Sequence, residues 1–248
     1  MGVDWDFDKL KNRTKKGVVG SMPAGMKFDF NQGINLQKFM SPIAVDWMRV
    51  IKPGGFVLCF SQNRLAHHMA MAIESAGFEI RDTLLWKYEG QAKAFSQNHF
   101  IQKRKISKKE KDRLIAKIGG RKTPQLKPRG ETIILGQAPR QGTFVDNWDH
   151  WETGLIDVSN PLIEPDKFPG TVVPCRKPRE RYGHITAKPV PLLRHLIRIF
   201  SCEGSLVFDP FVGSGSTCVA AKLENREFLG VEINKTMAEI GNNRIEEI

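Results

Sequence analysis

Helical and strand-like hydrophobic patterns alternate along the first third of the chain. Apolar residues recur at helical spacing over 40–50, and the Lys-Pro-Gly-Gly sequence at 52–55 predicts a turn. The short apolar run at 56–60 predicts a buried strand. Residues 64–76 predict a helix, and the segment 78–88 contains a second strand. This alternation is typical of an α/β domain.

The same alternation returns in the last third of the chain. The expected elements are a helix at 190–200, a strand at 206–208, a tight loop at 209–216, a helix at 217–223, a strand at 228–233 and a helix at 235–247. A strand, a helix and a strand in this order form a parallel unit with a right-handed connection. The chain is therefore predicted to be α/β.

The region 90–183 between these parts has a different composition. Prolines and charged residues interrupt the apolar runs, and the expected elements are a helix at 108–118 and a short strand at 132–135. We interpret the region as an insert that recognises a partner. The predicted organisation is one domain formed by 1–89 and 184–248, with 90–183 inserted between them.

Most of the positive charge lies in one part of this insert. The formal net charge is +11, and residues 102–130 contain twelve Lys and Arg against two acids, a difference of +10. Phosphate neutralisation with release of counterions favours a nucleic acid partner for such a segment. A solvated helix face remains the alternative. The candidate DNA-binding residues are Lys103, Arg104, Lys105, Lys108, Lys109, Arg121 and Lys122.

Several classes of protein do not fit the sequence. No apolar run approaches the roughly 20 residues that cross a bilayer, and the first residues lack the basic and apolar segments of a signal peptide. A cytoplasmic protein without a membrane partner is therefore expected. The cysteines at 59, 175, 202 and 218 form no Cys-x-x-Cys pair and have no His at zinc-ligand spacing. We expect reduced thiols and no metal site.

The most informative motif is Asp-Pro-Phe-Val-Gly-Ser-Gly-Ser-Thr at 209–217, between a predicted strand and a predicted helix. Gly213 and Gly215 permit close approach of a ligand to the backbone. Ligands of open α/β sheets bind beyond the carboxyl ends of the strands. Glu232 follows the next strand, where a carboxylate can accept hydrogen bonds from the ribose hydroxyls of a nucleoside. An ordinary tight turn remains the alternative for the glycine pair alone.

The surrounding residues narrow the choice of nucleoside. No Lys follows Gly215, so the loop lacks the Walker phosphate-binding pattern, and Cys218 stands where a dinucleotide fingerprint has its third small residue. Asp209 would repel a pyrophosphate, but it suits a ligand that carries an ammonium or sulfonium group. S-adenosylmethionine carries both groups and is the expected cofactor.

These residues resemble those of a known family. The motif at 209–217 and Phe-Leu-Gly-Val-Glu at 228–232 are similar to the cofactor motif of N4-cytosine and N6-adenine DNA methyltransferases of the permuted order. His-Ile-Thr-Ala-Lys-Pro at 184–189 resembles the family's His-x-x-x-Lys-Pro motif, with Ile185 where Pro is usual. The segment 50–87 resembles the part that follows the catalytic motif in phage and prophage methylases. The resemblance covers most of the chain.

The resemblance implies a Rossmann-like S-adenosylmethionine-dependent methyltransferase fold with an inserted target-recognition region. It implies that Glu232 binds the ribose, that the glycine loop holds the methionine part, and that the segment 184–189 closes the site with Lys188 near the methionine carboxylate. The candidate cofactor-binding residues are His184, Lys188, Pro189, Asp209, Pro210, Phe211, Gly213, Ser214, Gly215, Thr217 and Glu232. Double-stranded DNA is the implied partner, with methyl transfer to an exocyclic amine of a flipped base.

The family's catalytic motif is missing from the sequence. This motif is an Asp, Asn or Ser followed by Pro-Pro and an aromatic residue, and the chain contains no Pro-Pro pair. Asp-Trp-Asp at 4–6 resembles a segment that follows the motif in related methylases, so the motif is expected before Met1 and no catalytic residue is assigned. In the family, the strand that carries it lies between those expected here at 56–60 and 206–208. We therefore expect a fold that is incomplete at the N-terminus and is completed by upstream sequence or a separate polypeptide.

Three functions remain open at this point. The first is a site-specific DNA methyltransferase, truncated or split, that acts on adenine N6 or cytosine N4; its biological role, in restriction–modification, phage protection or regulation, stays open. The second is a catalytically inactive DNA-binding remnant, which the missing motif supports. The third is an RNA or small-molecule methyltransferase; the basic insert disfavours a small-molecule substrate but does not separate RNA from DNA.

Overall fold

The fold described below is that of a computed structural model. It covers residues 30–92, 94–184 and 186–248. These residues belong to two units, a larger one with Asn31–Tyr88 and Gly130–Ile248 and a smaller one with Glu89–Arg129. The Asp-Trp-Asp segment at 4–6 lies outside the described residues.

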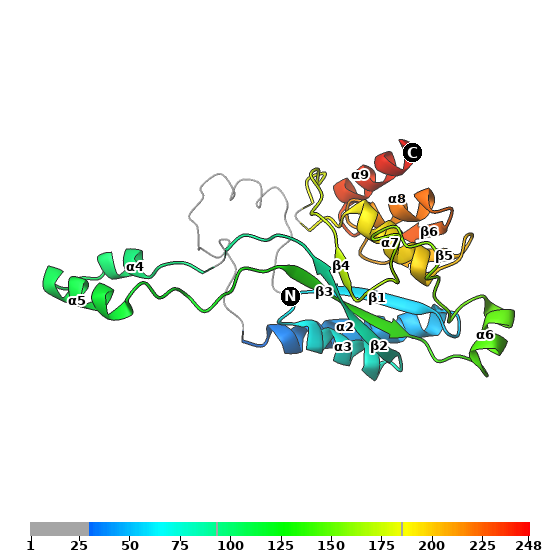
Figure 1. Cartoon of the computed structure of the whole chain (residues 1–248), viewed down its shortest axis with the longest axis horizontal. Helices are drawn as coiled ribbons and strands as arrows, with labels where there is room; N and C mark the ends of the chain where they lie inside the picture. The colour runs from blue at the N-terminus through cyan, green and yellow to red at the C-terminus, as the bar shows by residue number, and fades with distance from the viewer. Residues whose placement is uncertain (1–29, 93, 185) are drawn as a thin grey trace. The chain divides into compact units, whose positions relative to one another are not determined.

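A four-stranded sheet forms the centre of the larger unit, in the order β1-β3-β2-β4 (Figure 1). The strands are β1 (Phe56–Ser61), β2 (Glu79–Lys87), β3 (Gly130–Gln137) and β4 (Val172–Pro174). β3 pairs antiparallel with both β1 and β2, and β4 pairs parallel with β2. The strands predicted in the first third of the chain are therefore confirmed as neighbours of a strand from the predicted insert.

Strand β3 occupies a more central place than its sequence context indicates. Because successive strand residues point to opposite faces, Ile133 and Ile134 pack into different hydrophobic cores, and both are at most 2% exposed. The strand predicted at 132–135 is thus present, but it belongs to the core rather than to a separate insert. The structure divides the region 90–183 at residue 129.

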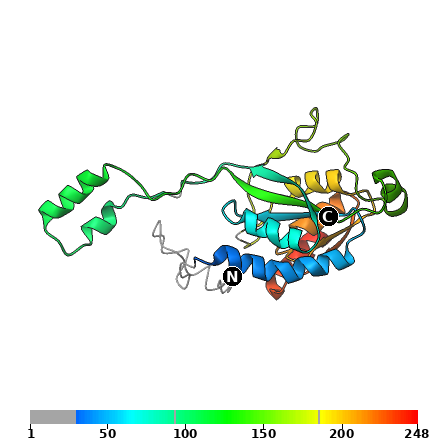
Figure 2. The same ribbon diagram turned by 90° about the horizontal axis from the view of Figure 1, so that it is seen from below.

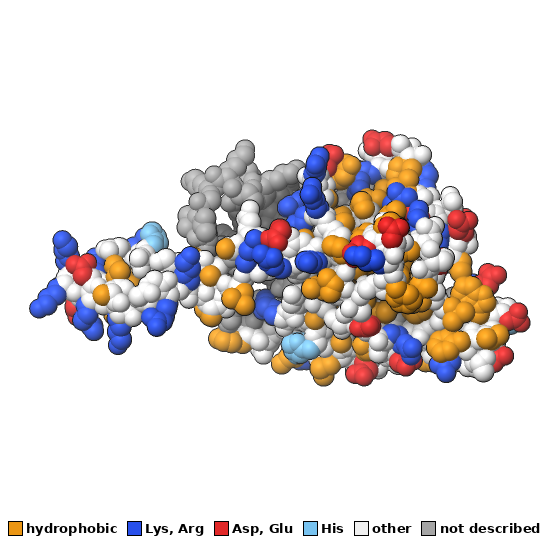
Figure 3. All heavy atoms as spheres, in the orientation of Figure 1, with side chains coloured by type: hydrophobic (Ala, Val, Ile, Leu, Met, Phe, Trp, Pro, Cys, Tyr) orange, Lys and Arg blue, Asp and Glu red, His pale blue; other side chains and the backbone are white. Residues whose placement is uncertain are grey.

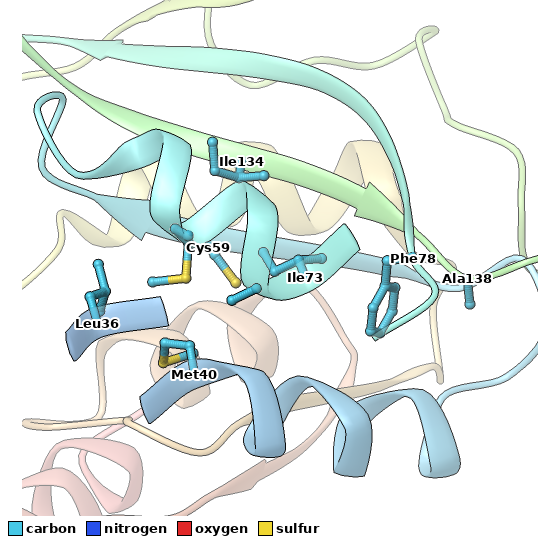
Figure 4. Packing of buried hydrophobic residues seen from close by; sticks show 9 residues of the cluster. Leu36, Met40, Cys59, Ile73, Phe78, Ile134 and Ala138 are labelled. Atoms are coloured by element: carbon cyan, nitrogen blue, oxygen red, sulfur yellow. The ribbon is translucent and has the colours of Figure 1, made fainter. Parts of the chain in front are cut away.

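Two helices cover one face of this sheet. They are α2 (Gln32–Val50) and α3 (Ala66–Ser75), whose apolar residues repeat at helical spacing. Figure 4 shows Leu36 and Met40 of α2 facing Ile73 of α3 and Ile134 of β3. Cys59 lies in the same cluster, and burial, assisted by the carboxylate of Asp209, raises the pKa of its thiol to about 12. All four cysteines are free thiols, as predicted.

Helix α7 (Val190–Phe200) covers the other face and carries two apolar stripes. Leu192 and Leu196 pack against Leu84, Trp86, Ile133 and Val173 of the four-stranded sheet. Leu193 and Ile197, the next residue in each case, pack against helix α8 (Ser216–Leu223). One helix therefore holds the four-stranded sheet and the C-terminal elements together.

The C-terminal elements form the predicted strand, helix and strand unit. Strands β5 (Leu206–Asp209) and β6 (Glu227–Gly230) pair in parallel, and α8 lies between them in the sequence. Helix α9 (Lys235–Glu246) follows. Strand β6 ends before the predicted limit at 233, so Glu232 lies in the loop that enters α9.

The smaller unit consists of two helices joined to a pair of chain segments. Helices α4 (Asn98–Gln102) and α5 (Lys108–Ile118) lie side by side in both views (Figures 1 and 2). The segments on either side of them meet at an antiparallel bridge between Ser96 and Lys122, next to a hydrogen bond from Thr123 N to Phe95 O of 3.1 Å. The helix predicted at 108–118 is confirmed.

Helix α6 (Phe144–Trp151) was expected to be a loop. It begins with a capping box, in which the Thr143 side chain accepts from Asp146 N and the Asp146 carboxylate accepts from Thr143 N. The Thr-x-x-Asp spacing was visible in the sequence, so this helix could have been predicted. Across the described part of the chain, each helix is too short or too polar to cross a membrane.

Candidate cofactor site

The glycine loop lies between β5 and α8, where the sequence placed it. Asp209 ends β5, and its two carboxylate oxygens hold the loop from inside. Oδ1 accepts the N–H of Phe211 at 2.9 Å, and Oδ2 accepts the hydroxyl of Thr217 at 2.6 Å. Backbone bonds between Val231 and both Asp209 and Val212 fix the loop against the end of β6. The position of the Asp209 carboxylate is therefore fixed by the loop itself.

Glu232 contacts the same loop from the other side. Its Oε2 accepts the N–H of Gly213 at 2.9 Å, and its Oε1 accepts the N–H of Asn234 at 2.8 Å. The structure thus brings together two motifs that lie 19 residues apart in the sequence. A carboxylate has about four acceptor positions, so Glu232 keeps capacity for further donors.

The two glycines of the loop are required by packing as well as by backbone conformation. Gly213 has φ of +55°, and a Cβ there would come within 2.8 Å of Nε2 of His184. Gly215 has φ of +81°, and its Cβ would come within 2.8 Å of Cα of Gly241 in α9. From the sequence, both glycines were expected to let a ligand approach the backbone. The structure shows that each also permits a close contact within the protein.

His184 lies directly against the loop, because a Cβ on Gly213 would come within 2.8 Å of its Nε2. Burial of its ring lowers the pKa below the ordinary histidine value; the Glu232 carboxylate opposes this shift and the Lys188 ammonium adds to it. The neutral form of His184 is therefore favoured relative to an exposed histidine. Ile185, the departure from the family motif, lies outside the described residues. Pro189 is buried and precedes the first turn of α7.

Lys188 has a partner that the sequence did not indicate. Its Nζ lies 3.0 Å from Oε1 of Glu131 at the start of β3, and above the rings of Phe60 and Trp86 at 5.1 and 5.9 Å. About a fifth of each charged side chain is exposed. The charge of Lys188 is therefore balanced within the protein. Glu131 was missed because it lies more than 50 residues from Lys188 and beside a basic segment.

Arg244 of α9 is a second residue that the sequence analysis missed. It is 9% exposed, and its Nη1 donates to the carbonyl oxygen of Ser214 and lies 3.2–3.3 Å from the hydroxyls of Ser214 and Ser216. Its guanidinium also lies 3.9 Å from the centre of the Tyr182 ring. Arg244 therefore connects the glycine loop to the segment that leads into His184.

The remaining predicted loop residues differ in exposure. Ser214 is 2% exposed and faces Arg244, whereas Phe211 is 53% exposed and its ring lies 6.4 Å from that of Phe39 in α2. Pro210, which precedes Phe211, is half-buried. Phe211 is therefore the loop side chain that an incoming ligand can reach most easily.

The predicted DNA-binding cations all lie in the smaller unit. Figure 3 shows Lys and Arg side chains projecting outward from it. Lys103, Lys105, Lys108, Lys109, Arg121 and Lys122 are exposed. Arg104 also has an exposed surface, but it lines a hollow between α4 and α5 together with Phe100 and Leu114.

Comparison with known proteins identifies the family. The family N6_N4_Mtase, described as DNA methylase, matches residues 17–243. The chain belongs to this DNA methylase family. The resemblance found in the sequence is thereby confirmed at the level of the family. The permuted order of motifs, the likeness to phage enzymes and the missing catalytic motif stay predictions.

Several curated methyltransferases are similar to this DNA methylase. It is 26% identical over 279 residues to the type II methyltransferase M.HindIII of Haemophilus influenzae. This alignment covers 98% of this chain and 85% of the relative. It is 27% identical over 214 residues to the orphan methyltransferase M.BamHII of Bacillus amyloliquefaciens, covering 82% of this chain and 78% of the relative.

Solved structures share the fold of this DNA methylase at low sequence identity. A putative DNA modification methylase of Thermus thermophilus, TTHA0409, in complex with S-adenosyl-L-methionine, aligns with a TM-score of 0.58 at 15% identity. The alignment covers 96% of this chain and 90% of that one. The M1.HpyAVI–SAM complex aligns with a TM-score of 0.57 at 17% identity, covering 88% and 85%. The predicted α/β methyltransferase fold is consistent with both.

Proposed function

We propose that this chain is the cofactor-binding and DNA-recognising part of a site-specific DNA methyltransferase. The reaction is transfer of a methyl group from S-adenosylmethionine to an exocyclic amine, adenine N6 or cytosine N4, of a flipped base. The observation that carries the proposal is the contact of Glu232 with Gly213, which unites the ribose-binding acid and the glycine loop. Membership of the DNA methylase family supports it.

The residues around the glycine loop fit S-adenosylmethionine. Glu232 retains acceptor positions for ribose hydroxyls, and Asp209 supplies negative charge next to the loop, where a sulfonium and an ammonium are stabilised. When bound, the cofactor supplies the electrophilic methyl group. The loop Asp209–Thr217 would hold its methionine part, and His184, whose pKa is lowered by burial, would add little positive charge to this site.

The segment from His184 to Pro189 closes this site in our proposal. Lys188 helps to do so through its ion pair with Glu131, which fixes the segment to the start of β3. The ammonium also lies close enough to His184 to influence its pKa. Its role toward the methionine carboxylate is therefore long-range electrostatic attraction, because Glu131 already holds its direct contact.

The catalytic motif is, in our proposal, carried by a strand between β1 and β5. Among the described residues, β1 is hydrogen-bonded to β3 alone and β5 to β6 alone, so each has one open edge. Both sheets pack on α7, and the Asp209 carboxylate affects the thiol of Cys59 on β1. An added strand would pair with backbone groups that otherwise lack partners. A separate polypeptide that carries the motif would supply this strand.

Equilibrium binding of S-adenosylmethionine to the purified chain tests the cofactor site. Glu232→Gln should weaken binding at least tenfold, because the amide replaces the charged acceptor. Glu239→Gln on α9 is the matched control. This side chain is 61% exposed, and its Oε1 lies 3.9 Å from Nζ of Lys235. Equal affinity of the two variants would remove Glu232 from the site.

Methyl transfer tests the rest of the proposal. We expect transfer to duplex DNA when the chain is mixed with a polypeptide that carries the missing strand and the Pro-Pro motif. The absence of any Pro-Pro pair supports a second candidate, an inactive DNA-binding remnant. DNA binding without methyl transfer in the completed mixture would favour this remnant.

A further inference from the structure

We propose that helix α5 binds the phosphate backbone of duplex DNA along one strand, through Lys109, Arg113 and Lys117. This inference rests on the proposed function and assigns its DNA contact to one face of one helix. Arg113 and Lys117 were not among the residues selected from the sequence. The position of these cations relative to the packing of α4 and α5 distinguishes them from the rest of the basic segment.

The packing of the two helices determines which face of α5 is free. Leu114 and Ile118 line the hollow between the helices together with Phe100 and Ile101. With 3.6 residues per turn, Lys109 and Arg113 fall on the side away from Leu114 and Ile118, and Lys117 falls on the flank next to Arg113. All three of these cations are exposed.

The spacing of the three cations suits a row of phosphates. They recur every four residues, which corresponds to about 6 Å of helix rise per step and about 12 Å in total. One strand of duplex DNA has a phosphate for about every 3.4 Å of axial rise. The row on α5 therefore extends over three to four phosphate intervals of one strand without any bend in the helix.

Three other cations of the smaller unit, Lys111, Lys127 and Arg129, are already engaged. Glu89 forms ion pairs with Lys127 at 2.7 Å and with Arg129 at 3.2 Å. Lys111 donates to the carbonyl oxygen of Gln102 at 2.8 Å and so points toward α4. Within the described ranges, no carboxylate lies within ion-pair distance of the cations at 109, 113 and 117.

The start of α5 carries more positive charge than helix stability favours. Lys108 and Lys109 lie in its first turn, where the helix dipole is positive and cations are unfavourable. Glu110, the acid of that turn, is directed to the hydroxyl of Ser107, which caps the helix. A phosphate near this end would offset the unfavourable interaction of Lys108 and Lys109 with the helix dipole. A helix face that contacts only solvent would not explain why both lysines occur there. A sequence that departs from a local stability rule in this way is typical of a functional surface.

The experiment compares two variants that each lose one Lys and one Arg. Arg113→Gln with Lys117→Gln removes two cations of the α5 row, and Lys127→Gln with Arg129→Gln removes the two that pair with Glu89. Binding of the full chain to a labelled DNA duplex is measured by anisotropy at increasing salt. Circular dichroism and S-adenosylmethionine binding check that both variants remain folded.

We expect the slope of log K against log salt to fall by about 1.8 for the α5 variant, since each phosphate contact contributes about 0.9. The control should change it by less than half as much. Equal slopes of log K against log salt for both variants would overturn the inference, and Lys109, Arg113 and Lys117 would then be interpreted as solvent-exposed residues without a DNA contact. Tighter binding to duplex RNA than to DNA would overturn the choice of partner.

The inference and the proposed function can fail separately. A chain that does not bind duplex DNA overturns the role of α5. The proposed cofactor site is tested separately by the effect of Glu232→Gln on S-adenosylmethionine binding. Glu232 belongs to the larger unit, so this test does not depend on α5.

Discussion

Replacement of Arg244 by Met should weaken both the fold and the cofactor site. Met preserves much of the side-chain length but removes every contact of the guanidinium with Ser214, Ser216 and Tyr182. A hydrogen bond from a charged donor contributes about 1.5–3 kcal/mol, and a desolvated cation over an aromatic ring contributes up to about 2 kcal/mol. Because these contacts share one side chain, their contributions are not additive.

We therefore expect the free energy of unfolding to fall by about 2–4 kcal/mol in Arg244→Met. Urea denaturation followed by tryptophan fluorescence measures this change, and calorimetry measures S-adenosylmethionine binding below the unfolding transition. Affinity should fall at least tenfold, because the carbonyl of Ser214 loses the donor that holds the loop. Arg244→Lys should retain part of both properties.

Lys235→Met on the same helix is the control, since this ammonium is 91% exposed and lies 3.9 Å from Glu239. It should change stability by less than about 0.5 kcal/mol. A similarly small effect of Arg244→Met, with unchanged cofactor affinity, would refute the role assigned to Arg244.

Two further predictions concern the glycine loop and pH. Gly215→Ala should lower the melting temperature more than Gly204→Ala: both glycines have positive φ, of +81° and +75°, but the added Cβ meets Gly241 at 2.8 Å in the first case and open space in the second. Equal shifts would mean that only backbone strain is involved. Burial, with the help of a nearby arginine, lowers the pKa of His195, whose Nδ1 accepts the N–H of Ile163 at 3.1 Å. The folded protein therefore binds this proton more weakly than the unfolded chain, so the stabilisation is complete above the ordinary value of 6.5 and is lost as the pH falls below it. Urea titrations at several pH values should show a shallower loss for His195→Gln; identical pH profiles would contradict the assignment.

The glycine loop could be predicted because its signal is local. Asp209, the two glycines and the start of the following helix lie within nine residues, and the motif defines their geometry directly. The position of Glu232 required one further step, the expectation that parallel strands end at the same edge of a sheet. The hydrogen bonds that the Glu232 carboxylate accepts from the backbone of Gly213 and Asn234 could not be predicted from the sequence pattern.

The residues that were missed act over long distances in the sequence. Arg244 lies 30 residues from Ser214, and Glu131 lies 57 residues from Lys188. No periodicity or spacing connects such pairs, because tertiary packing alone brings them together. Strand β3 was placed in the insert for a related reason: the charge and proline content around it conceal a short apolar run that both neighbouring strands require.

The two apolar stripes of α7 limit how this protein can vary. A substitution at Leu192 or Leu196 alters the cover of the four-stranded sheet, and one at Leu193 or Ile197 alters the support of α8. Recombination between related genes can exchange Glu89–Arg129 without touching either stripe. A crossover within α7 would instead combine a sheet from one parent with a cofactor loop fitted to the helix of another. A change within the smaller unit therefore leaves both stripes of α7 intact, whereas the sheet, α7 and the cofactor loop depend on one another for their packing.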